Sequence, residues 1–207
     1  ILMISSLVSA DPMVIAHRGF SSVAPENTMA AVHKALELSP QPQYIEIDLY
    51  RSQDGVLVIS HDENTLRTTG VAGILRETPF ETLRQLDAGY ATNFGEQFKG
   101  EKIPTLEEIL DAVKDTPVGI MIECKQLLLE DEVITLLRKR NEVGKHVIAS
   151  FDELTIFRAK KIEPKVKTLY LTGTLSPEIY WRAHDLKADI IGTNMGAKPA
   201  DVKTAQE

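Results

Sequence analysis

Titratable side chains stand at the ends of short apolar segments in this chain. His17-Arg18 closes the segment 13–16, Glu46 and Asp48 follow Tyr44-Ile45, and His61 closes the segment 56–59. Such β-branched, apolar segments are typical of buried strands. Titratable groups at their ends cost free energy unless they face a wet cleft or a metal ion. Two imidazoles, one guanidinium and two carboxylates therefore indicate metal-assisted chemistry on a phosphate ester.

The two carboxylates are spaced to lie on one face of a strand. Residues i and i+2 of an extended strand point the same way and lie roughly 6.5–7 Å apart, so Glu46 and Asp48 share a face. Their charges repel unless a cation neutralises them. Carboxylate oxygens suit one hard divalent cation, Mg²⁺ or Ca²⁺. A structural salt bridge to Arg or Lys is the alternative that this spacing leaves open.

A further apolar segment, 118–125, ends with an acid and a base. Glu123 and Lys125 share a face, with Glu123 as a candidate third metal ligand and Lys125 as a compact charge for a phosphate oxygen. A Glu–Lys pair on an exposed edge is the alternative, but the segment is too apolar for an exposed edge. Cys124 lies between them and is predicted to be a small core residue rather than a nucleophile.

Two of the five histidines differ from the others. His17 and His61 each end a predicted buried strand beside a charged neighbour, whereas His33, His146 and His184 have sequence surroundings typical of surface or capping roles. A histidine near neutral pKa can take a proton from a nucleophile, and a second can give one to a leaving alkoxide.

Short motifs occur in a fixed order along the chain, in the segments 17–19, 25–28, 46–48, 54–62, 66–69, 103–108, 123–125 and 150–152. In this order they resemble the glycerophosphodiester phosphodiesterase family, within the PLC-like phosphodiesterase superfamily. The similarity runs from about Met13 to Asn194.

The resemblance implies an activity and a role for each candidate residue. The activity is metal-dependent hydrolysis of a small glycerophosphodiester to sn-glycerol 3-phosphate and an alcohol such as choline or ethanolamine. The implied residues are His17 and His61 as the acid/base pair, Arg18 and Lys125 for phosphate, and Glu46, Asp48 and Glu123 for the metal.

Predicted strands and helices alternate along most of the chain. Strands are predicted at 13–17, 44–51, 57–61, 118–125, 146–150, 166–171 and 188–193, with helices at 26–38, 105–113, 130–143, 153–161 and 177–186. This alternation predicts an α/β fold with parallel strands, and the resemblance implies a TIM-type (β/α)8 barrel. Asp54-Gly55 predicts a hairpin that makes the barrel irregular between its second and third strands and places residue 48 opposite 61. The sequence after Asn194 shows no pattern for the last strand of the family's barrel, so this strand is predicted to be missing from the chain.

The chain is predicted to be one barrel domain over 13–207, preceded by a leader or signal-peptide remnant at 1–12. Val8-Ser9-Ala10 before Asp11 resembles a signal-peptidase site, which favours export over a cytoplasmic location. Residues 62–102 show little strand pattern and one short helix at 82–86. A long segment after a site-bearing strand is typical of a lid or substrate-binding insertion.

Composition fits a catalytic domain with one sizeable core, because the chain has 207 residues and 43% apolar content. A net charge of −7 argues against binding to nucleic acid or anionic membranes. No later apolar stretch is long enough to span a bilayer. An anionic small-molecule substrate must then be attracted locally, by Arg18, Lys125 and the cation. The sequence does not indicate an oligomeric state.

Three other functions are compatible with the same residues. A lysophospholipase D or phospholipase-type barrel would use this site on lipid substrates, and exposed apolar residues at 62–102 or 173–177 would favour it. A non-catalytic module would only bind phosphorylated ligands, which the two histidines argue against. A structural barrel fragment would assemble with a partner chain.

Overall fold

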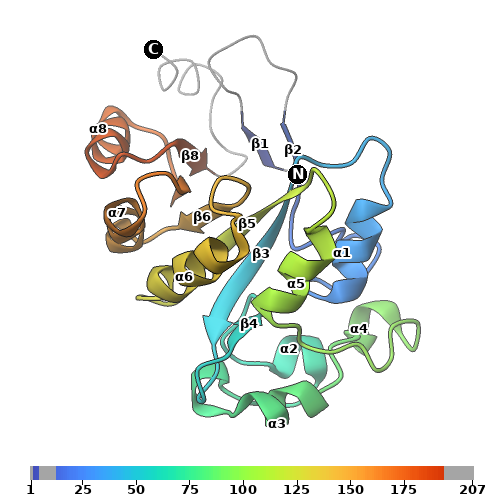
Figure 1. Ribbon diagram of the computed structural model, residues 1–207. Helices are drawn as coiled ribbons and strands as arrows, with labels where there is room; N and C mark the ends of the chain where they lie inside the picture. The colour runs from blue at the N-terminus through green and yellow to red at the C-terminus, as the bar shows by residue number, and fades with distance from the viewer. Residues whose placement is uncertain (1, 5–12, 194–207) are drawn as a thin grey trace. The chain divides into compact units, whose positions relative to one another are not determined.

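The computed structural model describes residues 2–4 and 13–193, which fall into two compact units (Figure 1). One unit runs from Ile15 to Gln126, and the other contains the chain from Leu127 onward together with its first residues. Of the predicted leader at 1–12, only β1 (Leu2–Ile4) is described. The predicted absence of a last strand falls after Asn194, outside the described residues. The single domain over 13–207 stays a prediction.

Parallel strands form the centre of the unit from Ile15 to Gln126. β3 (Tyr44–Arg51) lies between β2 (Met13–Ala16) and β5 (Gly119–Cys124), and both pairs are parallel. Ile45, Ile47 and Leu49 alternate with the carboxylates along β3 and are fully buried, so the other face of this strand is apolar. Cys124 is likewise buried, as predicted for a small core residue.

Helix α5 (Leu106–Val113) covers this sheet as its apolar pattern predicts. It begins with a capping box, in which the side chains of Thr105 and Glu108 each accept from the other residue's backbone amide. One face of α5 is fully buried and packs against α1, β4 and β5; its residues are Leu106, Ile109, Leu110 and Val113.

Helix α1 (Met29–Leu36) begins three residues later than predicted. Thr28 is its N-cap, with a side chain that accepts from the amide of Ala31. Asn27 has a φ of +58°, which lies outside the helical region, so the predicted helical turn from Glu26 does not form.

The connection from β3 to β4 (Leu57–Ile59) is a hairpin, as predicted, but its register differs by one residue. Leu49 lies opposite Ile59, so residue 48 is opposite 60 rather than 61. The amide of Ser52 donates to the carbonyl of Val56, which leaves three residues in the turn rather than two. Gly55 ends the turn with a φ of +89°. A three-residue turn closed by a left-handed glycine shifts each pair by one position.

The predicted insertion at 62–102 contains four short helices: α2 (Leu66–Thr69), η1 (Leu75–Glu77), α3 (Phe80–Gln85) and α4 (Ala91–Phe94). Only α3 was predicted. Figure 1 shows α2 and α3 at the carboxyl end of β3. The segment is held there by a buried apolar cluster of Val58, Leu75, Leu83, Ala88 and Ile103.

The unit that follows Gln126 repeats helix and strand in turn. Its elements are α6 (Glu130–Arg140), β6 (Val147–Ser150), α7 (Glu153–Ile162), β7 (Lys167–Thr172), α8 (Pro177–Leu186) and β8 (Ile190–Thr193). β6, β7 and β8 pair in parallel, and α7 packs on β6 and β7. The parallel β/α pattern confirms the predicted α/β, TIM-type fold class. Among the described residues, no helix combines the length and the apolar character needed to cross a bilayer.

Candidate active site

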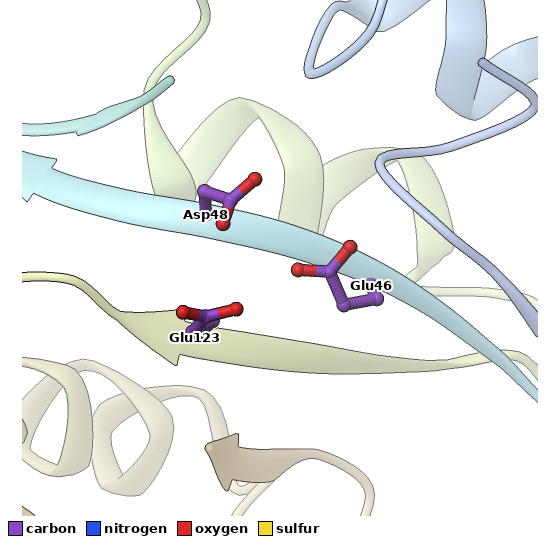
Figure 2. A group of neighbouring side chains, drawn as sticks. All are labelled: Glu46, Asp48 and Glu123. Atoms are coloured by element: carbon purple, nitrogen blue, oxygen red, sulfur yellow. The ribbon is translucent and has the colours of Figure 1, made fainter. Parts of the chain in front are cut away.

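Three carboxylates from two neighbouring strands converge, as Figure 2 shows. Asp48 on β3 lies directly opposite Glu123 on β5, and Glu46 lies two residues before Asp48 on the same face. One oxygen from each acid lies within 4.8 Å of the others. The strand register therefore produces the cluster that the i, i+2 spacing predicted.

Glu46 carries an acceptor atom that the surrounding protein does not satisfy. Its Oε2 accepts from the amide of Arg18 at 2.8 Å, while Oε1 is buried and has no hydrogen-bond partner among the described residues. Burial, followed by the charge of Asp48, raises the pKa of Glu46 well above its usual range. A divalent cation would satisfy Oε1 and neutralise the cluster, and an all-oxygen set suits Mg²⁺ or Ca²⁺. The residues present therefore fit the predicted metal.

Two cationic side chains lie against Asp48. The Arg18 Nε is 3.5 Å from one of its oxygens, and the Lys125 Nζ is 3.5 Å from the other. Lys125 also donates to Glu123 at 2.9 Å. Burial acts to lower the pKa of Lys125, but this bond and the charges of Glu123 and Asp48 outweigh it, so the net pKa is raised. Lys125 is therefore charged at neutral pH and available to a phosphate oxygen.

The two predicted histidines stand beside the cluster in different surroundings. His17 follows β2, and its Nε2 lies 3.8 Å from Glu46 Oε2. Partial burial, and then the positive charge of Arg18, lowers the pKa of His17. His61 follows β4, and its Nδ1 pairs with Asp62 Oδ1 at 2.6 Å. Because a carboxylate occupies Nδ1, Nε2 is the nitrogen of His61 that is available for proton transfer.

Asn27 is a site residue that the sequence reasoning missed. It is 4% exposed, and its Nδ2 donates to Asp48 Oδ2 at 2.8 Å while its Oδ1 accepts from the Asp48 amide at 3.1 Å. These two bonds fix the central carboxylate of the cluster. The family motif 25–28 contained Asn27, but the sequence suggested a helix start there, so no contact across to β3 was expected.

Two further charged residues, Glu26 and Arg67, contact the candidate site or its neighbours, although the sequence analysis assigned neither of them a role. Glu26 accepts from Arg18 at 2.9 Å, and Arg67 donates to both Glu26 and Asp62. Both residues belong to the motifs that carried the resemblance. All seven predicted site residues and these additional polar groups belong to the unit from Ile15 to Gln126.

Comparisons with known proteins identify relatives of this chain. A curated glycerophosphodiester phosphodiesterase from Caldanaerobacter subterraneus is 37% identical over 172 residues, which are 80% of this chain and 69% of the relative. A glycerophosphodiester phosphodiesterase from Bacillus subtilis is 31% identical over 183 residues, 80% of this chain and 61% of the relative. The chain thus spans about two thirds of the length of these relatives.

Solved structures show the same fold. A phosphodiesterase from Oleispira antarctica, in complex with the product sn-glycerol-3-phosphate, is 31% identical with a TM-score of 0.81, covering 98% of this chain and 84% of that one. A glycerophosphodiester phosphodiesterase from Agrobacterium tumefaciens is 27% identical with a TM-score of 0.71, covering 93% and 90%. The profile of the glycerophosphoryl diester phosphodiesterase family matches residues 17–189. The chain therefore belongs to this family of phosphoric diester hydrolases.

Proposed function

We propose that this chain catalyses metal-dependent hydrolysis of glycerophosphodiesters to sn-glycerol 3-phosphate and an alcohol. The observation that carries the proposal is the convergence of three carboxylates within 4.8 Å, with one buried oxygen left unsatisfied, beside two cationic side chains and two histidines. The product named in the Oleispira antarctica complex supports the glycerol phosphate half of the substrate.

Metal binding is assigned to Glu46, Asp48 and Glu123, and phosphate binding to Arg18 and Lys125. A divalent cation bound there would act as a Lewis acid toward a non-bridging phosphate oxygen. Arg18 and Lys125 hold the remaining phosphate oxygens and stabilise the charge that builds up on them in the transition state.

The two histidines move the protons. One of His17 and His61 takes a proton from the attacking oxygen as its bond to phosphorus forms. The other gives a proton to the leaving oxygen as the bond between phosphorus and the alcohol breaks. The attacker is water or, as the family resemblance implies, the 2-hydroxyl of the substrate's glycerol, which gives a cyclic phosphate first.

Turnover of glycerophosphocholine with Mg²⁺ or Ca²⁺, and with EDTA, tests the activity and its metal dependence. His17→Ala and His61→Ala should each lower turnover by roughly 10²- to 10⁴-fold while a metal-dependent rise in melting temperature persists. His33→Ala is the matched control, because His33 is exposed on α1. Near-normal turnover in both site variants would refute the acid/base assignment, and turnover unaffected by EDTA would refute the metal dependence.

A lipid substrate is the second candidate, and exposed apolar residues in the segment 62–102 are the feature that would favour it. Leu66 and Val71, in the segment 62–102, are 53% and 52% exposed. Isolated exposed apolar side chains are common on soluble proteins, so two of them favour a small substrate over a lipid. Comparing kcat/KM for glycerophosphocholine and lysophosphatidylcholine decides between the two, and an absence of turnover on both would favour a module that only binds phosphorylated ligands.

A further inference from the structure

Arg67, on α2, is held by two carboxylates and a tyrosine. Its Nε donates to Asp62 Oδ2 at 2.5 Å, and its two terminal nitrogens donate to the two oxygens of Glu26 at 2.9 and 2.7 Å. The hydroxyl of Tyr90 accepts a further bond at 3.2 Å, and the guanidinium lies 5.6 Å from the centre of the Tyr90 ring. These partners hold the planar guanidinium of Arg67 in a single orientation.

Each of the two carboxylates continues to a residue assigned to the reaction. Asp62 uses its other oxygen to bond His61 Nδ1 at 2.6 Å. Glu26 accepts from the guanidinium of Arg18 at 2.9 Å. An unbroken set of polar contacts therefore runs from Arg18 through Glu26, Arg67 and Asp62 to His61. These contacts connect Arg18, a proposed phosphate-binding residue, to His61, one of the two residues proposed to transfer protons.

The charge states of the two intermediate acids suit this arrangement. The hydrogen bond from Arg67 is the main cause that lowers the pKa of Asp62. Burial acts to raise the pKa of Glu26, but the bond from Arg67 and the charge of Arg18 outweigh it and lower it. Both acids are therefore carboxylates at neutral pH. A carboxylate on Nδ1 holds the neutral imidazole in one tautomer, with Nε2 free to accept a proton.

The simpler explanation is that Arg67 has a purely structural role and only stabilises the position of α2 within its unit. Its side chain is 37% exposed, and exposed ion pairs contribute little to stability. Two features argue for a role in positioning the site residues. Both partners of Arg67 contact residues assigned to the reaction, and the bond to Glu26 is bidentate, a geometry that fixes orientation as well as distance.

We propose that Arg67 is a positioning residue, which aligns His61 through Asp62 and Arg18 through Glu26 without touching the substrate. The inference rests on the proposed phosphodiesterase function. It assigns a role to the segment 62–102, because Arg67 in this segment joins Asp62 to Glu26.

The test compares kcat and KM of Arg67→Ala and Arg67→Lys on glycerophosphocholine with the activating metal. Because Arg67 contacts Asp62 and Glu26, which in turn contact His61 and Arg18, Arg67→Ala should lower kcat by roughly 10- to 100-fold. Arg67→Lys should recover part of the loss, because it restores the charge but not the planar guanidinium. Arg76→Ala is the matched control: Arg76 lies in the same segment, and its ion pairs among the described residues are with Glu63 and Glu77 rather than with a proposed site residue. It should stay within about twofold of wild type, as expected for a surface substitution.

A double variant separates positioning from folding. If Arg67 acts through Asp62, Arg67→Ala combined with Asp62→Asn should lose little more activity than the worse single variant. Added guanidinium at a non-denaturing concentration should raise kcat of Arg67→Ala and leave Arg76→Ala unchanged, which a purely structural role does not predict.

Each outcome distinguishes the two proposals. An active wild type with an equally active Arg67→Ala would overturn the role of Arg67 alone. Multiplying losses in the double variant, together with no response to guanidinium, would overturn it as well. A wild type without turnover on any metal would overturn the proposed function itself. If Arg67→Ala does not fold, Arg67→Lys and Asp62→Asn carry the same comparison.

Discussion

Removing the amide of Asn27 should weaken both the fold and the metal site. Asn27→Gly keeps a backbone that tolerates a φ of +58° but deletes both bonds to Asp48, at 2.8 and 3.1 Å. The bond to the charged carboxylate contributes about 1.5–3 kcal/mol and the bond from the Asp48 amide about 1 kcal/mol. The free energy of unfolding in urea with EDTA should therefore fall by about 2.5–4 kcal/mol.

Asn27→Ala adds a backbone cost to the lost hydrogen bonds. A left-handed conformation costs an alanine about 1–2 kcal/mol relative to glycine, so Asn27→Ala should be less stable than Asn27→Gly by that amount. Asn141 offers a matched control, because it is exposed at the end of α6 with the same φ of +58°. Asn141→Gly should be nearly neutral, while Asn141→Ala should show the same difference from its glycine variant.

The same substitution should also weaken cation binding. Without its two bonds to Asn27, Asp48 is held less firmly beside Glu46 and Glu123, and losing such a supporting contact typically costs about 10- to 100-fold in metal affinity. Titrating Mg²⁺ or Ca²⁺ against melting temperature measures this loss. An Asn27→Gly variant within about 1 kcal/mol of wild type, with unchanged metal affinity, would refute the view that Asn27 fixes Asp48.

Three further outcomes are expected. A divalent cation at about 100 times its Kd should stabilise the fold by about 2.7 kcal/mol, which raises the melting temperature by about 5–10 °C. Glu46→Gln should abolish this rise. An equal rise in the variant would contradict the proposed metal site. Gly19→Ala should lower the free energy of unfolding by about 2–5 kcal/mol, because a Cβ there would lie 2.6 Å from the Ala31 Cβ and the backbone has a φ of +80°. Gly70 has a similar φ of +74° but nothing within 4 Å of an added Cβ. Gly70→Ala should therefore cost only about 1–2 kcal/mol in the same urea assay. Burial lowers the pKa of His146 to about 4, so the unfolded chain binds the extra proton and stability falls as the pH drops from 6.5 toward 4. The free energy of unfolding should fall by about 2 kcal/mol between pH 7 and pH 5, which lowers the urea midpoint at pH 5 relative to pH 7. The His146→Gln variant should lack this contribution, so its two urea midpoints should differ by less than those of wild type.

The strands and the carboxylate face were predictable because they follow from local periodicity. Alternation in 44–51 places acids on one face and apolar side chains on the other whatever the partner strand is. The buried Ile45, Ile47 and Leu49 confirm that division. The capping box at Thr105 was equally local, since its bonds span three residues.

The parts that were missed depend on long-range contacts or on turn geometry. Glu26 meets Arg67 across 41 positions in sequence, and Asn27 meets Asp48 across 21, which no local pattern encodes. The hairpin register was wrong by one residue because Asp54-Gly55 is compatible with both a two-residue and a three-residue turn. α2, η1 and α4 have three or four residues each, too few to show a helical period.

The balance of charge at the site explains why a cation would be needed before catalysis begins. Among the described residues of the site and its supporting contacts, five carboxylates face three cationic side chains, which leaves a formal charge of −2; the residues are Glu26, Glu46, Asp48, Asp62 and Glu123 against Arg18, Arg67 and Lys125. The chain as a whole carries −7, so no global field draws in a phosphodiester. A divalent cation would bring this balance to zero, and a proton on either of the proposed catalytic histidines would make it positive. We therefore expect the cation to bind before the substrate, because the anionic phosphodiester is repelled from the site until its charge is neutralised.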